Sequence, residues 1–292
     1  MRRLGRWFLG LLVVIAGAVA ALYGYTTFRF NHRYDIASRN LALPTDSASL
    51  ERGKRLATTL GKCIDCHTPD LGGQVFFNDG AMGTVAARNL TGGVGSEVGD
   101  WSPAQWDQAI RHGVGPSRAA LVIMPSTSYQ YLTDTDAAAL IAYLKTVPKV
   151  DRSFPPRSLG PVARALSTAG KLPIFEATHI AHDSVGTRPP MGEGEYIART
   201  AGCYGCHGPT LAGGPIPGAP PETPPAANIS TTGLINWTLA DFTTALRTGK
   251  RPDGSQIKEA MPWKLTAGMT DGEIEALWIY LRSTGTPASP SS

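Results

Sequence analysis

The chain has 292 residues, of which 42% are hydrophobic; this supports a packed core, predicts two domains from the length, and excludes a disordered protein. The formal net charge of +4 lies entirely in residues 1–30, which hold four Arg and no acidic residue, while the rest of the chain holds 23 basic and 23 acidic residues. Because no basic excess is left to neutralise phosphates, the composition excludes nucleic-acid binding.

The N-terminal segment has the pattern of a membrane-spanning helix. Trp7 to Phe28 is a run of 22 residues without a charge, and about 20 apolar residues suffice to cross a bilayer. Three arginines precede the run, which predicts that the N-terminus stays in the cytoplasm and the rest is exported. Ala18-Val19-Ala20 also resembles a cleavage site, so a cleaved signal peptide is the alternative.

The next predicted elements are a helix over about Ala48–Leu60 and a cysteine motif directly after it. Cys63, Cys66 and His67 form a Cys-x-x-Cys-His pattern, which is the attachment motif of c-type haem. Two thiols one helical turn apart can each add to a vinyl group of one porphyrin. The following imidazole can then reach the iron.

A second copy of the motif uses the other two cysteines of the chain, Cys203 and Cys206, followed by His207. The sequence therefore predicts two covalently attached haem c groups, with His67 and His207 as iron ligands. The alternatives are two short-loop disulfides or a zinc site. A structural zinc needs four ligands, however, and both clusters stop at three.

Each motif heads a similar series of helices, which indicates a duplicated unit. Ser102 is the predicted cap of a helix that stops at Gly113, and Thr238 and Gly249 repeat this arrangement. A last helix with one apolar stripe follows in each half. The first helix of each half contains a glycine, Gly53 or Gly194, where we expect the first and last helices to cross.

No period-two alternation argues for a sheet, so the predicted fold is all-α, with two tandem domains after the N-terminal helix. We expect a membrane anchor or signal peptide at residues 1–30, a first domain at 31–150 and a second at 191–292. The proline-rich connector at 151–190, with a short helix at Pro161–Leu166, should pack against one or both domains.

The second iron ligand of each unit is predicted to be a methionine. Met124 and Met261 are each followed by Pro, and they lie 57 and 54 residues after the motif histidines, in a loop before the last helix. A thioether thus arrives at the same place in both copies. Met82 and Met191 have no such equivalence, and Met269 fits a hydrophobic staple.

Other polar residues are weaker candidates for contacts with the haem. His112, His179 and His182 could displace a methionine, although His112 ends a helix and is expected to interact with its dipole. Arg111 and Arg247 occupy matching helix ends. They are either partners of haem propionates or solvated residues.

These motifs together resemble the class I c-type cytochrome domain, over about residues 47–147 and 191–284. The stretch from Asn89 through Trp101 to Met124-Pro125 is similar to the cytochrome subunits of membrane-bound alcohol, aldehyde and gluconate dehydrogenases. Those typically carry three haem motifs, whereas this chain has two and an N-terminal anchor. The resemblance implies haem c, His/Met ligation and assembly on the outer side of the bacterial cytoplasmic membrane.

The expected function is electron transfer by a membrane-anchored dihaem cytochrome c, a non-enzymatic carrier with no small-molecule substrate. Its expected partners are the membrane and a redox protein: a dehydrogenase, a quinol-oxidising complex or a terminal oxidase. The alternative is a dihaem peroxidase, which would need one iron with an open position. The paired Met-Pro sequences argue against such a position.

Overall fold

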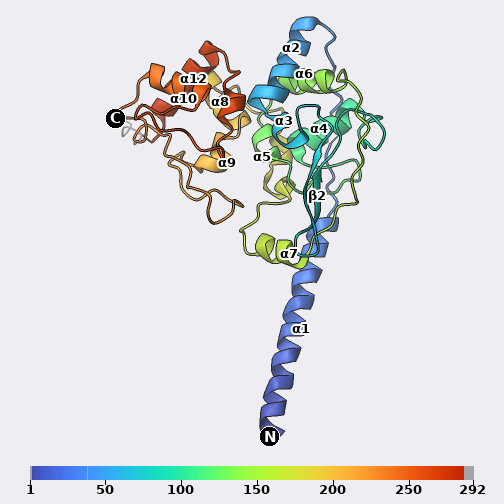
Figure 1. The fold of residues 1–292 in the computed structure, drawn as a ribbon. Coiled ribbons are helices and arrows are strands. Elements are labelled where there is room, and N and C mark those ends of the chain that lie inside the picture. Colours follow the sequence, from blue (N-terminus) through green and yellow to red (C-terminus); the bar gives the residue numbers. More distant parts are fainter. Residues whose placement is uncertain (1, 38, 286–292) are drawn as a thin grey trace, which may run out of the picture.

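The computed structural model describes residues 2–37 and 39–285. One long helix stands apart from a globular part in which two groups of helices lie side by side (Figure 1). The first group runs from blue to green in the figure and follows the long helix; the second is orange to red and ends at the C-terminal side. The predicted order of one apolar helix and two helical units is confirmed.

The long helix α1 (Arg2–Asn31) has 30 residues. The most apolar 18 residues within its stretch Leu4–Asn31 have a mean hydropathy of 2.2 and are not buried, and among the described residues this helix alone is long and apolar enough to cross a membrane. Length and composition fit a signal sequence equally well. The helix is therefore a candidate anchor.

The first helical unit is capped as its sequence predicts. The Ser102 hydroxyl accepts a hydrogen bond from the N–H of Gln105, whose side chain accepts one from the N–H of Ser102. Gly113 ends that helix with φ 66°. The helices of this unit are α2 (Ser47–Arg55), the π-helical turn η1 (Leu56–Leu60), α3 (Cys63–His67), α4 (Pro103–His112), α5 (Ser126–Tyr129) and α6 (Asp134–Leu144).

The second unit repeats this order, and in both units the first and last helices cross at a glycine. A Cβ on Gly53 would overlap the Ala139 carbonyl of α6, and one on Gly194 would overlap the Ala276 carbonyl. The predicted crossings are thus present. The helices of the second unit are α8 (Glu193–Thr200), α9 (Cys203–His207), α10 (Leu239–Thr248), α11 (Trp263–Thr266) and α12 (Asp271–Ser283).

The expectation that the chain forms no sheet is wrong for one segment. Strands β1 (Gln74–Asp79) and β2 (Gly83–Ala87) pair as an antiparallel hairpin with an irregularity between Val75 and Phe77. The bulge breaks the two-residue period of β1, and β2 alternates only small side chains between buried and half-buried positions. Neither strand therefore shows an apolar–polar alternation in its sequence.

The connector packs chiefly against the first unit and also meets the second, where a Cβ on Gly218 would lie 2.7 Å from the Pro173 ring. The backbone N–H of Phe175 donates to the Val122 carbonyl at 3.0 Å, and Phe175 belongs to an apolar cluster with Val85 of the hairpin and Val114. The helical elements of the connector are α7 (Pro161–Thr168) and two 3-10 turns, η2 (Glu176–His179) and η3 (His182–Ser184).

The two helical units share one interface. Arg52 of α2 pairs with Asp136 of its own unit at 2.7 Å and with Glu273 of α12 at 3.3 Å. The Tyr196 hydroxyl of α8 donates to Asp136 at 2.6 Å. One buried apolar cluster extends through both units, from Leu56 to Leu281. The units are therefore packed together along their first and last helices.

Candidate functional site

Both cysteine motifs lie on single helical turns that begin after a residue in the left-handed region. Lys62, with φ 52°, precedes Cys63, and Gly202, with φ 75°, precedes Cys203. All four cysteines are free thiols, so the structure does not form the alternative disulfides. Burial raises the pKa of the Cys63 thiol to about 12.

Each motif histidine is oriented by a main-chain carbonyl. The Nδ1 atom of His67 lies 2.7 Å from the Arg88 oxygen, and that of His207 lies 2.7 Å from the Ala227 oxygen. Because a carbonyl only accepts, Nδ1 carries the proton and Nε2 keeps its lone pair. Burial lowers the pKa of both rings. This is the tautomer that a histidine needs to bind iron.

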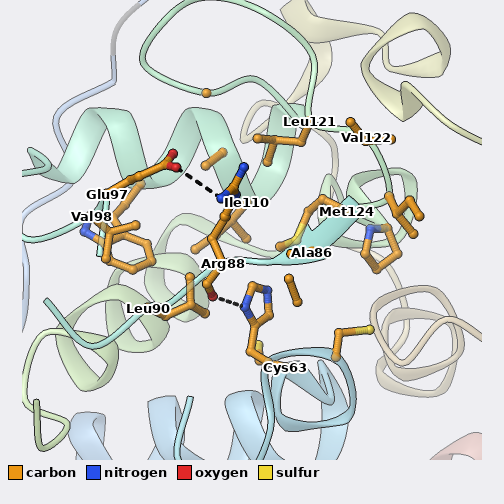
Figure 2. A pocket seen from close by; sticks show the side chains of 18 of the residues that line it. Cys63, Ala86, Arg88, Leu90, Glu97, Val98, Ile110, Leu121, Val122 and Met124 are labelled. Carbon is orange, nitrogen blue, oxygen red and sulfur yellow. Dashed lines mark hydrogen bonds and ion pairs between the residues drawn. The ribbon is translucent and has the colours of Figure 1, made fainter. Parts of the chain in front are cut away.

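The first motif opens into an apolar cavity of about 420 Å³. Cys63, Cys66, His67 and Met124 all line it, so the structure brings together the four residues predicted for the first site. Figure 2 shows Cys63 on the floor and Met124 reaching in from another wall, beside Leu121 and Val122, with the Arg88 carbonyl joined to an imidazole.

The chemistry of this cavity fits a haem. Its walls are mostly apolar, as expected for a cofactor site, and they present a neutral imidazole and a thioether. The wall also contains Trp106, whose indole N–H is buried and has no hydrogen-bond partner within the described residues. A buried donor without an acceptor is costly, so this N–H favours a ligand that brings an acceptor.

The two Met-Pro loops have the same backbone geometry. The N–H of Ser126 donates to the Met124 carbonyl at 2.8 Å, and that of Trp263 donates to the Met261 carbonyl at 2.7 Å. Pro125 has φ −78° and ψ 55°, and Pro262 has φ −77° and ψ 54°. The equivalence of the two methionines inferred from spacing therefore extends to their local structure.

A family model described as cytochrome c matches the chain twice, over residues 50–148 and 192–285. The chain belongs to the cytochrome c family. Membership implies haem, iron and electron transport, and the two matched segments support a count of two haem c groups. They contain both cysteine motifs and both Met-Pro loops.

Curated relatives of this cytochrome include proteins of two kinds. A diheme cytochrome c-type protein of Cereibacter sphaeroides is 29% identical over 79% of this chain and 84% of its own. The cytochrome c subunit of a quinone alcohol dehydrogenase of Gluconacetobacter polyoxogenes is 29% identical over 84% of this chain. The gluconate 2-dehydrogenase cytochrome c subunit of Pantoea cypripedii is 27% identical over 84% of this chain.

The cytochrome spans only 58% and 62% of those two dehydrogenase subunits. The names of the relatives fit an electron carrier rather than a catalytic subunit, and they give no support to the peroxidase alternative.

The other histidines of this cytochrome lie outside the haem cavity. His112 does not simply end its helix as expected: it is buried and stacks on His182, with ring centroids 5.2 Å apart and the two Nδ1 atoms 3.0 Å apart. Burial, His182, Arg111 and Arg39 lower the pKa of His112 to about 4. His179 is exposed on η2.

The remaining methionines do not line the first cavity, in agreement with their status as weaker candidates for iron ligands. Met269 is buried in the shared core, as expected of a staple. Met82 packs against the cluster beneath the hairpin, and Met191 lies half-buried before α8.

Arg111 is not a solvated helix end and does not line the first cavity, whereas Arg247 is half-buried. Arg111 is fully buried and pairs with Asp107 and, at 2.7 Å, with Asp134. Arg247 pairs with Asp271 at 2.6 Å. In both units this arginine joins the middle helix to the start of the last helix.

Several residues of the cavity wall were missed at the level of sequence, among them Trp106, Arg88 and Arg157. Trp106 lies one turn into α4, where only its position on the inward face could have pointed to it. Arg88 and Arg157 add cationic side chains to the cavity wall. The connector supplies Arg157, and no sequence pattern links it to the motif.

Proposed function

We propose that the protein is a membrane-anchored dihaem electron carrier on the outer face of the bacterial cytoplasmic membrane. Its proposed role is that of the cytochrome subunit of a membrane-bound dehydrogenase, passing electrons to a quinol-linked complex or a terminal oxidase. The names of the relatives support the dehydrogenase partner. The uncharged run from Trp7 to Phe28 within α1 supports the anchor, and the arginines before that run support the orientation.

The observation that carries the proposal is the repeated pairing of an oriented histidine with a Met-Pro loop. We assign His67 and Met124 as the axial ligands of the first unit, and His207 and Met261 as those of the second. Cys63, Cys66, Cys203 and Cys206 are the proposed thioether attachments. A haem bound in this way supplies reversible one-electron chemistry. When protein side chains fill both axial positions, no position is left for a substrate.

The contact between the two motifs supports a relay. The Lys62 ammonium donates a hydrogen bond to the Ala201 carbonyl at 2.7 Å. Lys62 directly precedes Cys63, and Ala201 lies two residues before Cys203. The two attachment turns are thus neighbours across the interface, as a chain that passes electrons from one unit to the other requires.

A carbon monoxide difference spectrum of the dithionite-reduced protein tests this function. Carbon monoxide binds only ferrous haem with a free or weakly held axial site, so we expect no spectral change in the wild type. A shift in about half of the haem would contradict one methionine assignment and favour the peroxidase.

Three variants make the test specific. Met124→Ala and Met261→Ala should each open one axial position, so that carbon monoxide binds about half of the haem. Met269→Leu is the control, because this buried methionine aligns with Leu132 of the first unit and should leave the spectrum unchanged. Failure of either alanine variant to bind carbon monoxide would contradict that ligand assignment.

A further inference from the structure

The connector helix α7 turns its apolar side outward. Val162 and Leu166 are 44% and 37% exposed, whereas the buried residues of the helix are only the small Ala163, which joins the apolar cluster beneath the hairpin, and Ser167. A helix on the surface of a water-soluble unit normally turns its larger apolar side chains inward. The exposed residues form a stripe with i, i+3, i+4, i+7 spacing: Val162, Ala165, Leu166 and Ala169.

The same helix is tied to the far end of α1. The Arg164 guanidinium donates hydrogen bonds to the hydroxyls of Thr26 and Thr27, at 2.6 and 3.0 Å. It also lies over the ring of Tyr23, at 4.6 Å from the centroid. These contacts fix α7 at one level along α1.

That level coincides with the outer edge of a bilayer. Thr26 follows Arg6 by 20 residues, a rise of about 30 Å at 1.5 Å per residue, which matches the thickness of the hydrocarbon core. Figure 1 shows α7 at the base of the globular part, where α1 enters it. The hairpin turn also lies there, because the Val162 N–H donates to the Ala81 carbonyl at 3.0 Å.

We propose that α7 lies in the outer interface of the bilayer, with its exposed stripe at the boundary between headgroups and acyl chains. The proposal rests on the proposed role of α1 as a retained anchor. Lys171, exposed just beyond α7, is placed to meet lipid phosphates. Two contacts with the membrane, α1 and α7, restrict rotation of the first unit about α1 and fix its height above the lipid.

Spin-label accessibility in the full-length holoprotein tests this contact. The protein is reconstituted in vesicles of phosphatidylethanolamine and phosphatidylglycerol, with nitroxide on Leu166→Cys, Val162→Cys or Ile279→Cys. The label is specific if the proposed thioether attachments occupy the four native cysteines of the holoprotein, which the unsubstituted protein, treated with the same reagent, controls for. Ile279 is the matched control, since it is an apolar residue 61% exposed on α12 of the second unit.

We expect the labels at positions 166 and 162 to collide several-fold more with oxygen than with a water-soluble nickel chelate, and the label at 279 to show the reverse. If position 166 behaves like 279 while the protein resists a carbonate wash, the α7 proposal is overturned and the anchor stands. Release by carbonate would overturn the anchor as well. A label shielded from both quenchers would indicate a second protein copy in place of lipid.

Discussion

The two haem units share their main-chain scaffold more closely than their side chains. His67 and His207 each meet a carbonyl oxygen at 2.7 Å, but Arg88 supplies it in the first unit and Ala227 in the second. A carbonyl can come from any residue, so this orientation survives substitution. The scaffold therefore fixes the imidazoles, while the side chains around them are free to differ.

The differences make the first site more cationic and more polar. Two pairs of equivalent positions exchange a polar residue for a nonpolar one: Arg88 for Ala227, and Trp106 for Phe242. Lys62 takes the place of Gly202, but its ammonium donates to the Ala201 carbonyl beside the second motif, so its charge does not distinguish the two sites. The connector also places Arg157 on the wall of the first cavity. The comparison indicates two sites of one design with different electrostatic surroundings, and the predictions below test its consequences.

The largest expected difference in stability between the two units comes from substituting the equivalent arginines of their middle helices. Arg111→Met leaves the Asp107 carboxylate buried without its partner, which should cost about 3–5 kcal/mol of unfolding free energy. Arg247→Met breaks a pair in which Asp271 is 92% exposed, so it should cost about 1 kcal/mol or less. Guanidinium unfolding followed by circular dichroism measures both.

A double variant tests the stated cause. Arg111→Met with Asp107→Leu removes both charges, so it should recover a large part of the stability lost in Arg111→Met. Equal losses in the Arg111 and Arg247 single variants would contradict the contrast between a buried and an exposed pair.

Substituting the glycine at the helix crossing should destabilise the two units equally. Gly53→Ala and Gly194→Ala each place a Cβ against a main-chain carbonyl of the last helix. Because a backbone atom cannot move aside cheaply, each variant should lose about 3 kcal/mol in thermal or denaturant unfolding. Gly272→Ala is the control, since no atom lies within 4 Å of that position. A loss confined to one unit would show that the crossings are not equivalent.

The features that the sequence could predict are those that depend on residues close together in the chain. The Ser102 cap, the Gly113 stop and the Met-Pro repeat depend on neighbouring residues, and the structure contains each of them. What it could not predict depends on distant partners. The burial of Arg111 requires Asp134 from another helix, and the stacking of His112 requires His182 from the connector.

This histidine pair predicts an acid sensitivity that has no counterpart at the equivalent position of the second unit, where Thr248 takes the place of His112. The folded state lowers the pKa of His112 to about 4, below the ordinary value of about 6.5. The stability that neutral His112 contributes to the folded state is therefore complete above pH 6.5 and is lost as the pH falls toward 4. Linkage gives a loss of about 2 kcal/mol between pH 7 and pH 5.

Denaturant unfolding at pH 7 and pH 5 measures this loss in the wild type and in His112→Thr. The variant should be less stable at pH 7, yet it should lose less stability on acidification. His182 is the second ring of the pair, and burial lowers its pKa too. His182→Asn should therefore reduce the acid loss in the same way. An unchanged pH dependence in both variants would contradict the assignment.

The smallest predicted effect tests the electrostatic contrast itself. Positive charge near a redox centre favours the reduced state, so the first unit should have the higher reduction potential. Arg88→Ala introduces the residue that the second unit uses, and the carbonyl that holds His67 remains. Because about 1 kcal/mol corresponds to about 40 mV for one electron, the higher potential should fall by tens of millivolts and the lower one should stay.

Spectroelectrochemical titration resolves the two potentials, and the reverse change, Ala227→Arg, should raise the lower one. Lys54→Ala is the control, because Lys54 is exposed on α2 and its ammonium pairs with the exposed Glu51 at 3.8 Å. A shift of both potentials together would mean that the charge acts through the shared interface. A shift of the lower potential alone would reverse the assignment, and the first unit would then be where electrons enter the relay.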